Sequence, residues 1–300
     1  TRQRLGEVYT DSNGRFAITQ PDDITLTLQV ITATASGDEV KLYNARYDIE
    51  EQYAISDYTY QISGDSVYWG ITNFNDVSSS YDEGATAFFE IELIGRKTRD
   101  DNGYNVPACL CIYPGNTNVL GGALGIYLLG QNKMHIADNQ FYSISHEFGH
   151  HIQVNKGVQV TPAVYSRYCD SFTSSGMAYM EGWADFYRSW RDDETGVESY
   201  SCAAYTIRLV KTVHAGFWDL YDSAVDGESC TISPANLISA FRSQDLNMLS
   251  YMSYLKVLYP GYATQIDNVQ SVNKLYDQTL LASVDESPTL PAAAIKTELL

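Results

Sequence analysis

Positive charge is scarce in this sequence of 300 residues. It contains 19 Lys and Arg against 37 Asp and Glu, which gives a formal net charge of −18. Proteins that bind nucleic acids contact the phosphates through Lys and Arg, so we expect no nucleic-acid partner. Long apolar runs are also missing, because the best one, residues 123–129, is far shorter than the roughly 18 residues that a membrane-spanning helix needs. We therefore expect no membrane span.

Cysteine is too rare and too irregularly spaced for a zinc ribbon, which needs two CxxC pairs. The five cysteines are an odd number, so at least one is unpaired within the chain. We expect buried thiols or one or two disulfides rather than cysteine metal ligands. The sequence starts at Thr1 without a signal peptide, and Tyr, Ser and Thr are frequent while Lys is rare. These features favour an extracellular or cell-surface protein whose signal sequence has been removed.

What is present begins with a β-rich segment. Residues 24–31 alternate apolar side chains with Thr or Gln, as a half-buried strand does, and Asn13-Gly14 is a strong hairpin signal. Further strands are predicted at residues 40–43 and 58–62. Residues 6–16 resemble the small β-sandwich modules related to the carboxypeptidase regulatory domain. We therefore predict a small β module over residues 1–70 and a larger domain over residues 71–300.

The larger domain is predicted to be α+β, with a mostly helical C-terminal half. An apolar face at helical spacing indicates a helix within residues 82–100, and strands are predicted at 106–113 and 125–137. Ser233-Pro234 is typical of a helix start, with a capping side chain followed by Pro at the first helical position. Helices are predicted at residues 141–156, 174–190, 200–222, 234–243, 246–258 and 266–282.

Histidine is as scarce as cysteine, yet three of the five lie within residues 146–151. Residues 146–150 read His-Glu-Phe-Gly-His on a predicted helix. Positions four apart share one helix face, so His146 and His150 can bind one ion together. Glu147 lies beside the first ligand, where it can act as a base without binding the metal. The following His151 points away from this face, so we expect it not to be a ligand.

A catalytic zinc site needs a third protein ligand. A metzincin would have Gly at position 153 and His at position 156, but this chain has Gln153 and Lys156. The strongest candidate is Glu181, on the next predicted helix. Asp185 lies one turn further on the same face, where it can orient a ligand histidine through the outer ring nitrogen.

Two alternatives remain for these acids. Asp170 competes with Glu181 as the third ligand, although it lies in a loop-like stretch with no partner at helical spacing. Asp185 could instead be an ordinary solvated or helix-capping acid.

His146-Glu147-Phe-Gly-His150 followed by Glu181-Gly-Trp-Ala-Asp185 resembles the gluzincin group of zinc metallopeptidases, which includes the thermolysin-like and fungalysin-like families. The resemblance covers roughly residues 125–222. It implies a zincin-like metallopeptidase domain that holds one Zn²⁺ ion through His146, His150 and Glu181, with Glu147 as the general base.

The resemblance also bears on the flanking segments. It implies that the strand at residues 125–137 lines the cleft and pairs with an extended substrate. In fungalysin-like enzymes a later segment similar to residues 213–220 carries a histidine that stabilises the transition state. By carry-over His214 is the candidate for that role, and a packing role in a Tyr- and Trp-rich helix is the alternative.

These features predict a zinc-dependent peptidase that acts on a peptide or protein substrate, with a metal-activated water and Glu147 as general base. A second hypothesis is a catalytically degenerate zincin that serves as a secreted or cell-surface binding protein. A third is a zinc hydrolase of a non-peptide amide, because the His-Glu-x-x-His motif alone does not distinguish the two substrates.

Overall fold

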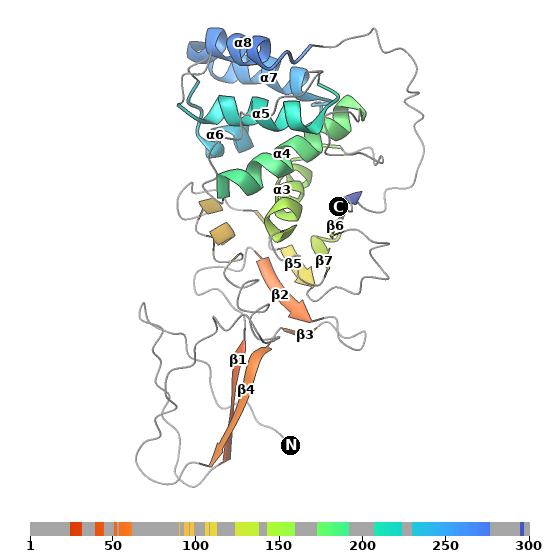
Figure 1. Cartoon of the computed structure of the whole chain (residues 1–300), viewed down its shortest axis with the longest axis vertical. Helices are drawn as coiled ribbons and strands as arrows, with labels where there is room; N and C mark the ends of the chain where they lie inside the picture. Colours follow the sequence, from red (N-terminus) through yellow and green to blue (C-terminus); the bar gives the residue numbers. More distant parts are fainter. Residues whose placement is uncertain are drawn as a thin grey trace.

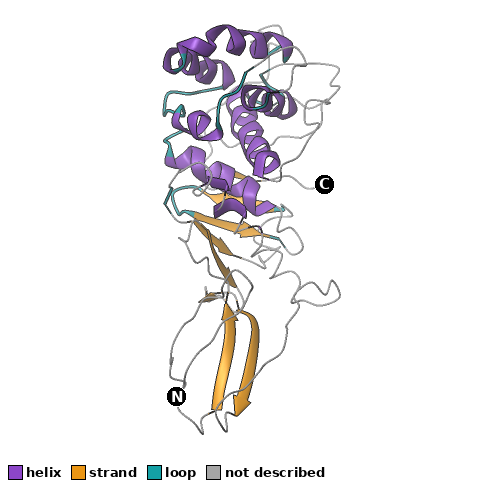
Figure 2. Cartoon of the chain, turned by 90° about the vertical axis from the view of Figure 1, so that its left-hand side faces the viewer, coloured by secondary structure: helices purple, strands orange, loops and turns teal. Residues whose placement is uncertain are grey.

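The fold is α+β, as the sequence predicts. The computed structural model describes residues 25–31, 40–44, 51–52, 54–61, 90, 93–95, 97–98, 106–107, 109–112, 124–137, 143–159, 173–191, 207–223, 230–276 and 295–296. The described helices gather at one end of the molecule and a two-stranded ribbon forms the other end, with a mixed sheet between them (Figures 1 and 2).

The strands form two sheets. Strands β1 (Thr25–Ile31) and β4 (Ala54–Gln61) pair as the antiparallel ribbon, with a register shift between Val30 and Ile31. The second sheet has six strands in the order β3-β2-β5-β7-β6-β8. Its members are β2 (Val40–Asn44), β3 (Glu51–Gln52), β5 (Cys109–Ile112), β6 (Gly125–Leu128), β7 (Lys133–Ile136) and β8 (Ile295–Lys296).

The mixed sheet has a parallel centre and antiparallel flanks. Strands β2, β5 and β7 run parallel to one another, whereas β6 is antiparallel to both β7 and β8. Strand β2 lies within the predicted module of residues 1–70 but is paired with β5 of the predicted domain 71–300. The division at residue 70 stays a prediction, and the predicted hairpin at Asn13-Gly14 lies outside the described residues.

The single strand predicted at residues 125–137 is two strands instead. A turn between β6 and β7 reverses the chain, and the amide of Gln131 donates to the carbonyl of Leu128 at 3.2 Å. Gly130 and Asn132 have positive φ angles of 73° and 50°. Gly and Asn accept this left-handed backbone most readily, so they permit a tight turn within an otherwise strand-forming segment.

The described helices overlap the predicted ones. They are α3 (Ser143–Asn155), α4 (Ser175–Arg191), α5 (Val210–Tyr221), α6 (Pro234–Ser239), α7 (Met248–Leu258) and α8 (Ala263–Val272), with a short 3-10 helix η4 (Pro260–Tyr262) before α8. The Ser233 hydroxyl accepts from the Asn236 amide, which confirms the predicted cap of α6. Among the described helices, none is long and apolar enough to cross a membrane.

The core lies between the helices and the sheet. Helix α3 packs on β5, β6 and β7, and α4 packs against both α3 and α5. Aromatic side chains fill the space between α4, α5 and α7, with Trp183 edge-on to Phe217 and Phe241 at centroid distances of 5.3 and 4.7 Å. Tyr179 and Tyr251 complete this cluster at 5.7 Å from each other. The ligand-bearing helices α3 and α4 therefore rest on a dense aromatic core.

Candidate metal centre

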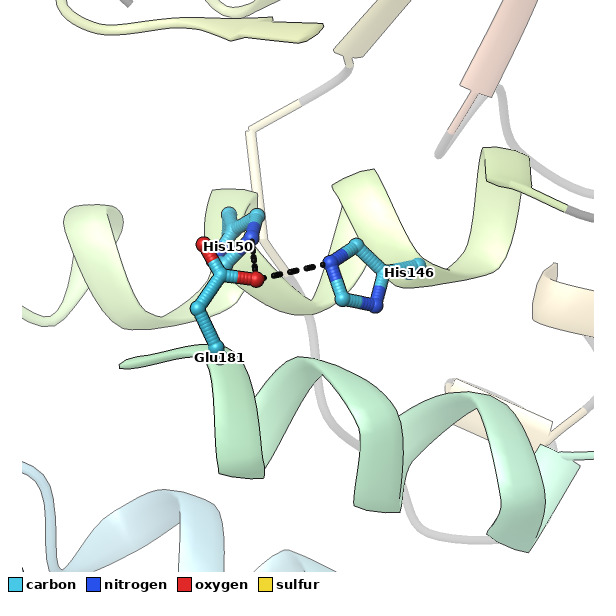
Figure 3. A group of neighbouring side chains, drawn as sticks. All are labelled: His146, His150 and Glu181. Atoms are coloured by element: carbon cyan, nitrogen blue, oxygen red, sulfur yellow. Dashed lines mark hydrogen bonds and ion pairs between the residues drawn. The ribbon is translucent and has the colours of Figure 1, made fainter. Parts of the chain in front are cut away.

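Helices α3 and α4 bring three predicted ligands together (Figure 3). His146 and His150 lie one turn apart on α3, and Glu181 reaches them from α4. One ligand atom of each residue lies within 4.8 Å of the others, and all three residues are buried. The structure therefore contains a His-His-Glu cluster that could bind a metal ion.

The spacing of the ligand atoms suits a small ion. Oε2 of Glu181 lies 3.1 Å from Nε2 of His146 and 3.4 Å from Nε2 of His150. Ligands about 2.0–2.1 Å from a tetrahedral zinc ion would be about 3.3 Å apart, so these distances fit. Among the described residues, Nδ1 of His150 has no hydrogen-bond partner, and its Nε2 faces the Glu181 carboxylate. A buried donor set with this deficit is well matched to a cation.

The cluster favours the ionised form of Glu181. Burial acts to raise its pKa, but the charge of His150 and the hydrogen bonds from both histidines outweigh burial and lower the pKa from 4.5 to about 2. The carboxylate is therefore negative at any ordinary pH. A negative ligand buried beside two imidazoles provides the charge that a divalent cation needs.

Asp185 lies on the far side of His146. Its Oδ1 is 3.0 Å from Nδ1 of His146, whose other ring nitrogen faces Glu181. With a metal ion bound, a proton held on Nδ1 by this carboxylate would leave the lone pair of Nε2 directed at the ion. Asp185 is thus placed to fix the ring orientation and tautomer of His146.

Two glycines allow the helices to approach closely. A Cβ atom at Gly149 would lie 2.9 Å from Cα of Ala184, so α3 and α4 touch backbone to backbone next to His150. A Cβ atom at Gly182 would lie 2.6 Å from Cγ1 of Val213, which brings α5 equally close beside Glu181. The indole of Trp183 donates to the carbonyl of Gly149 at 3.1 Å and ties α4 to α3.

Glu147 is buried on α3 and lies against β6. A Cβ atom at Gly125 would be 2.7 Å from its Oε1 and 3.0 Å from its Cγ. Cys109 and Cys111 of β5 are buried free thiols, and burial is the main cause that raises the pKa of both. The negative charge of Glu147 adds to this, after that of Cys111 in the case of Cys109. Glu147 therefore lies between the helix and the sheet.

Among the described residues, the ligand cluster includes neither His214 nor His151. His214 is buried on α5, with its backbone nitrogen 3.0 Å from the Cβ position of Gly182. His151 is 3.0 Å from the Tyr127 hydroxyl and 2.5 Å from the Pro107 carbonyl, so it ties α3 to neighbouring segments. Burial lowers the pKa of His151, although the bond to Pro107 opposes this. Asp170, the alternative ligand, lies outside the described residues.

The glycines that make room for the cluster are functional residues that no sequence motif marks. Gly125, Gly149 and Gly182 each lie where a side chain would collide with another element. The local signal in the sequence is that Gly149 and Gly182 each adjoin a predicted ligand.

Comparisons of the chain with family models, curated proteins and solved structures found no match.

Proposed function

We propose that this chain is a zinc-dependent peptidase of the gluzincin type. The observation that carries the proposal is the buried cluster of His146, His150 and Glu181, with Glu147 next to the first of them. Two histidines and one glutamate are a donor set typical of catalytic zinc sites that keep a fourth position open. Asp185 beside His146 adds the supporting carboxylate that such sites usually have.

His146, His150 and Glu181 would hold the ion. When bound, zinc would polarise the scissile carbonyl and lower the pKa of the attacking water. Glu147 then accepts a proton from the attacking water and delivers it to the leaving amine. His214 is our candidate donor to the developing negative charge. The substrate is a peptide or protein, and the setting is extracellular or at the cell surface.

Metal analysis and peptide hydrolysis of the Glu147→Gln variant test the proposal. We expect about one zinc per chain in both wild type and variant, because Glu147 is not a ligand. Hydrolysis of a peptide library should fall on the order of 10²–10⁴-fold in the variant, because the proton acceptor is lost. Asp267→Asn is the matched control, since among the described residues this exposed carboxylate pairs with Lys256 at the surface.

Two outcomes would contradict the proposal. Full activity in Glu147→Gln would show that Glu147 is not the general base. A zinc-loaded wild type that cleaves no peptide in the library would favour the degenerate, binding form of the fold. The Glu181→Ala variant should lose its zinc. Zinc retained in this variant at full stoichiometry would show that another residue is the third ligand.

A further inference from the structure

The outer edge of β6 is occupied by a segment from far along the chain. Strand β7 pairs with one side of β6, and β8 pairs with the other. In this antiparallel pairing Lys296 lies opposite Ile126 and Ile295 lies opposite Tyr127. Figure 1 shows β8 as the short blue arrow beside β6, apart from the helical layer. Residues 295–296 therefore cover the β6 edge.

This edge lies beside the candidate metal centre. Gly125, the residue before Ile126, faces Glu147 so closely that a Cβ atom there would be 2.7 Å from Oε1. One residue of a strand advances about 3.3 Å, so the pair of Lys296 and Ile126 begins about 3.3 Å along β6 from that contact. The β8 pairing thus begins one residue along β6 from the glycine that contacts the proposed general base.

An extended peptide and β8 would need the same groups of β6. Peptides that add to a sheet edge bind through the N–H and C=O groups of the edge strand. Each β6 group that pairs with β8 is already used, because a backbone donor supplies one hydrogen bond. The two strands are therefore mutually exclusive at Ile126 and Tyr127.

We propose that residues 295–296 occupy a peptide-docking edge on β6 and compete there, within the same molecule, with extended peptides. The inhibitory consequence rests on the proposed peptidase function. The contact involves only two residues of β8, and ordering each residue opposes binding by about 1–2 kcal/mol. A substrate that pairs over a longer stretch displaces it, so β8 raises KM rather than abolishing turnover.

Binding measured without catalysis tests the docking edge. The Ile295→Pro/Lys296→Pro variant of the full chain lacks the two amide donors of β8, and Ile295→Val/Lys296→Arg is the control that retains them. Both are made with Glu147→Gln, and fluorescence polarisation follows binding of a labelled peptide with the sequence of residues 291–300. If β8 covers the edge nine-tenths of the time, the proline variant should bind about tenfold more tightly. Equal affinities would overturn the proposal.

A reversible lock provides the second test. Positions 126 and 296 are register partners in the strand pair, so a disulfide between cysteines introduced at both would hold β8 in place. Oxidised protein should bind the labelled peptide at least tenfold more weakly than the same protein reduced with a phosphine. Peptide binding that is unaffected by the lock would contradict the proposal. An affinity for the labelled peptide that falls with rising protein concentration would also overturn the proposal, because it would show that β8 of a second copy covers the β6 edge.

Activity separates this inference from the proposed function. With Glu147 present, the proline variant should show kcat/KM raised threefold or more, mainly through a lower KM. If no variant hydrolyses peptides but the binding difference holds, the docking edge stands and the peptidase function fails. If wild type hydrolyses peptides and neither binding test responds, the function stands and the docking edge fails.

Discussion

The Glu147 carboxylate fits against β6 because residue 125 is a glycine and carries no side chain. A methyl group there would enter the space of Oε1, Cγ and Cδ of Glu147, at 2.7, 3.0 and 3.2 Å. Glu147 is buried, so its carboxylate has little freedom to move aside. Gly125 is therefore a positioning residue for the proposed base.

We expect Gly125→Ala to lower kcat while zinc remains bound. Displacing a reacting group by about 1 Å can reduce the rate on the order of 10²-fold, so a fall of tenfold or more is expected. Steady-state kinetics with zinc analysis would measure this. Gly261→Ala is the control, because nothing lies within 4 Å of the Cβ position at Gly261. An unchanged kcat in Gly125→Ala would show that the carboxylate tolerates the methyl group.

The low pKa of Glu181 predicts a pH-dependent stability in metal-free protein. Its folded pKa of about 2 lies below the ordinary 4.5, so its contribution is present above pH 4.5 and is lost as the pH falls toward 2. Each pKa unit corresponds to about 1.4 kcal/mol, so wild type should lose about 1–2 kcal/mol more than Glu181→Gln between pH 6 and pH 3. Urea unfolding after chelation measures this difference, and parallel pH profiles would contradict it.

At the scale of elements, the site depends on how closely α3, α4 and α5 approach. The Gly149 contact with Ala184 and the Gly182 contact with Val213 each lie next to a ligand, so ligand positions follow helix spacing directly. A cluster drawn from two helices is only as well placed as their packing.

Gly149→Ala should weaken both folding and metal binding. Ala is about 1 kcal/mol better than Gly in a helix interior, so the intrinsic effect would be stabilising. The methyl group would instead meet the Ala184 backbone at 2.9 Å, and such overpacking typically lowers stability by about 1–3 kcal/mol. Denaturant unfolding and zinc titration measure the two effects, with Gly261→Ala as control. A more stable variant with normal zinc affinity would show that the helices can separate without consequence.

The ligand cluster could be predicted because its information is local. His146 and His150 are four residues apart on one helix, and Glu181 and Asp185 repeat that spacing on the next. The β6–β7 turn is not predicted because strand-forming residues lie on both sides of Gly130 and Asn132, where positive φ angles reverse the backbone. The pairing of β2 with β5, and of β6 with β8, joins segments far apart in sequence. No local pattern of residues encodes such partners.

At the scale of the whole molecule, the cluster lies where the helical layer meets the sheet. Helix α3 contacts both β6 and α4, so the ligands join the two layers. The net charge of −18 favours the approach of cations and disfavours anionic substrates. Metal binding should therefore affect the stability of this entire part of the fold.

Zinc should raise the melting temperature of chelator-treated protein. A ligand that binds only the folded state adds about 2.7 kcal/mol at a concentration of 100 times its Kd. Calorimetry or dye-based melting measures the shift, and Glu181→Ala should show little of it because one of three ligands is gone. An equal shift in both proteins would mean that zinc binds elsewhere.

The bond from Trp183 to Gly149 gives the molecule an internal optical reporter. The indole is fully buried, lies two residues beyond Glu181, and donates across the α3–α4 contact at 3.1 Å. If the two helices part, this indole meets water and its fluorescence emission moves to longer wavelength, which is resolved once the other three tryptophans are replaced by Phe. The packing of the two ligand-bearing helices can thus be followed by tryptophan fluorescence, without an added label and without a substrate.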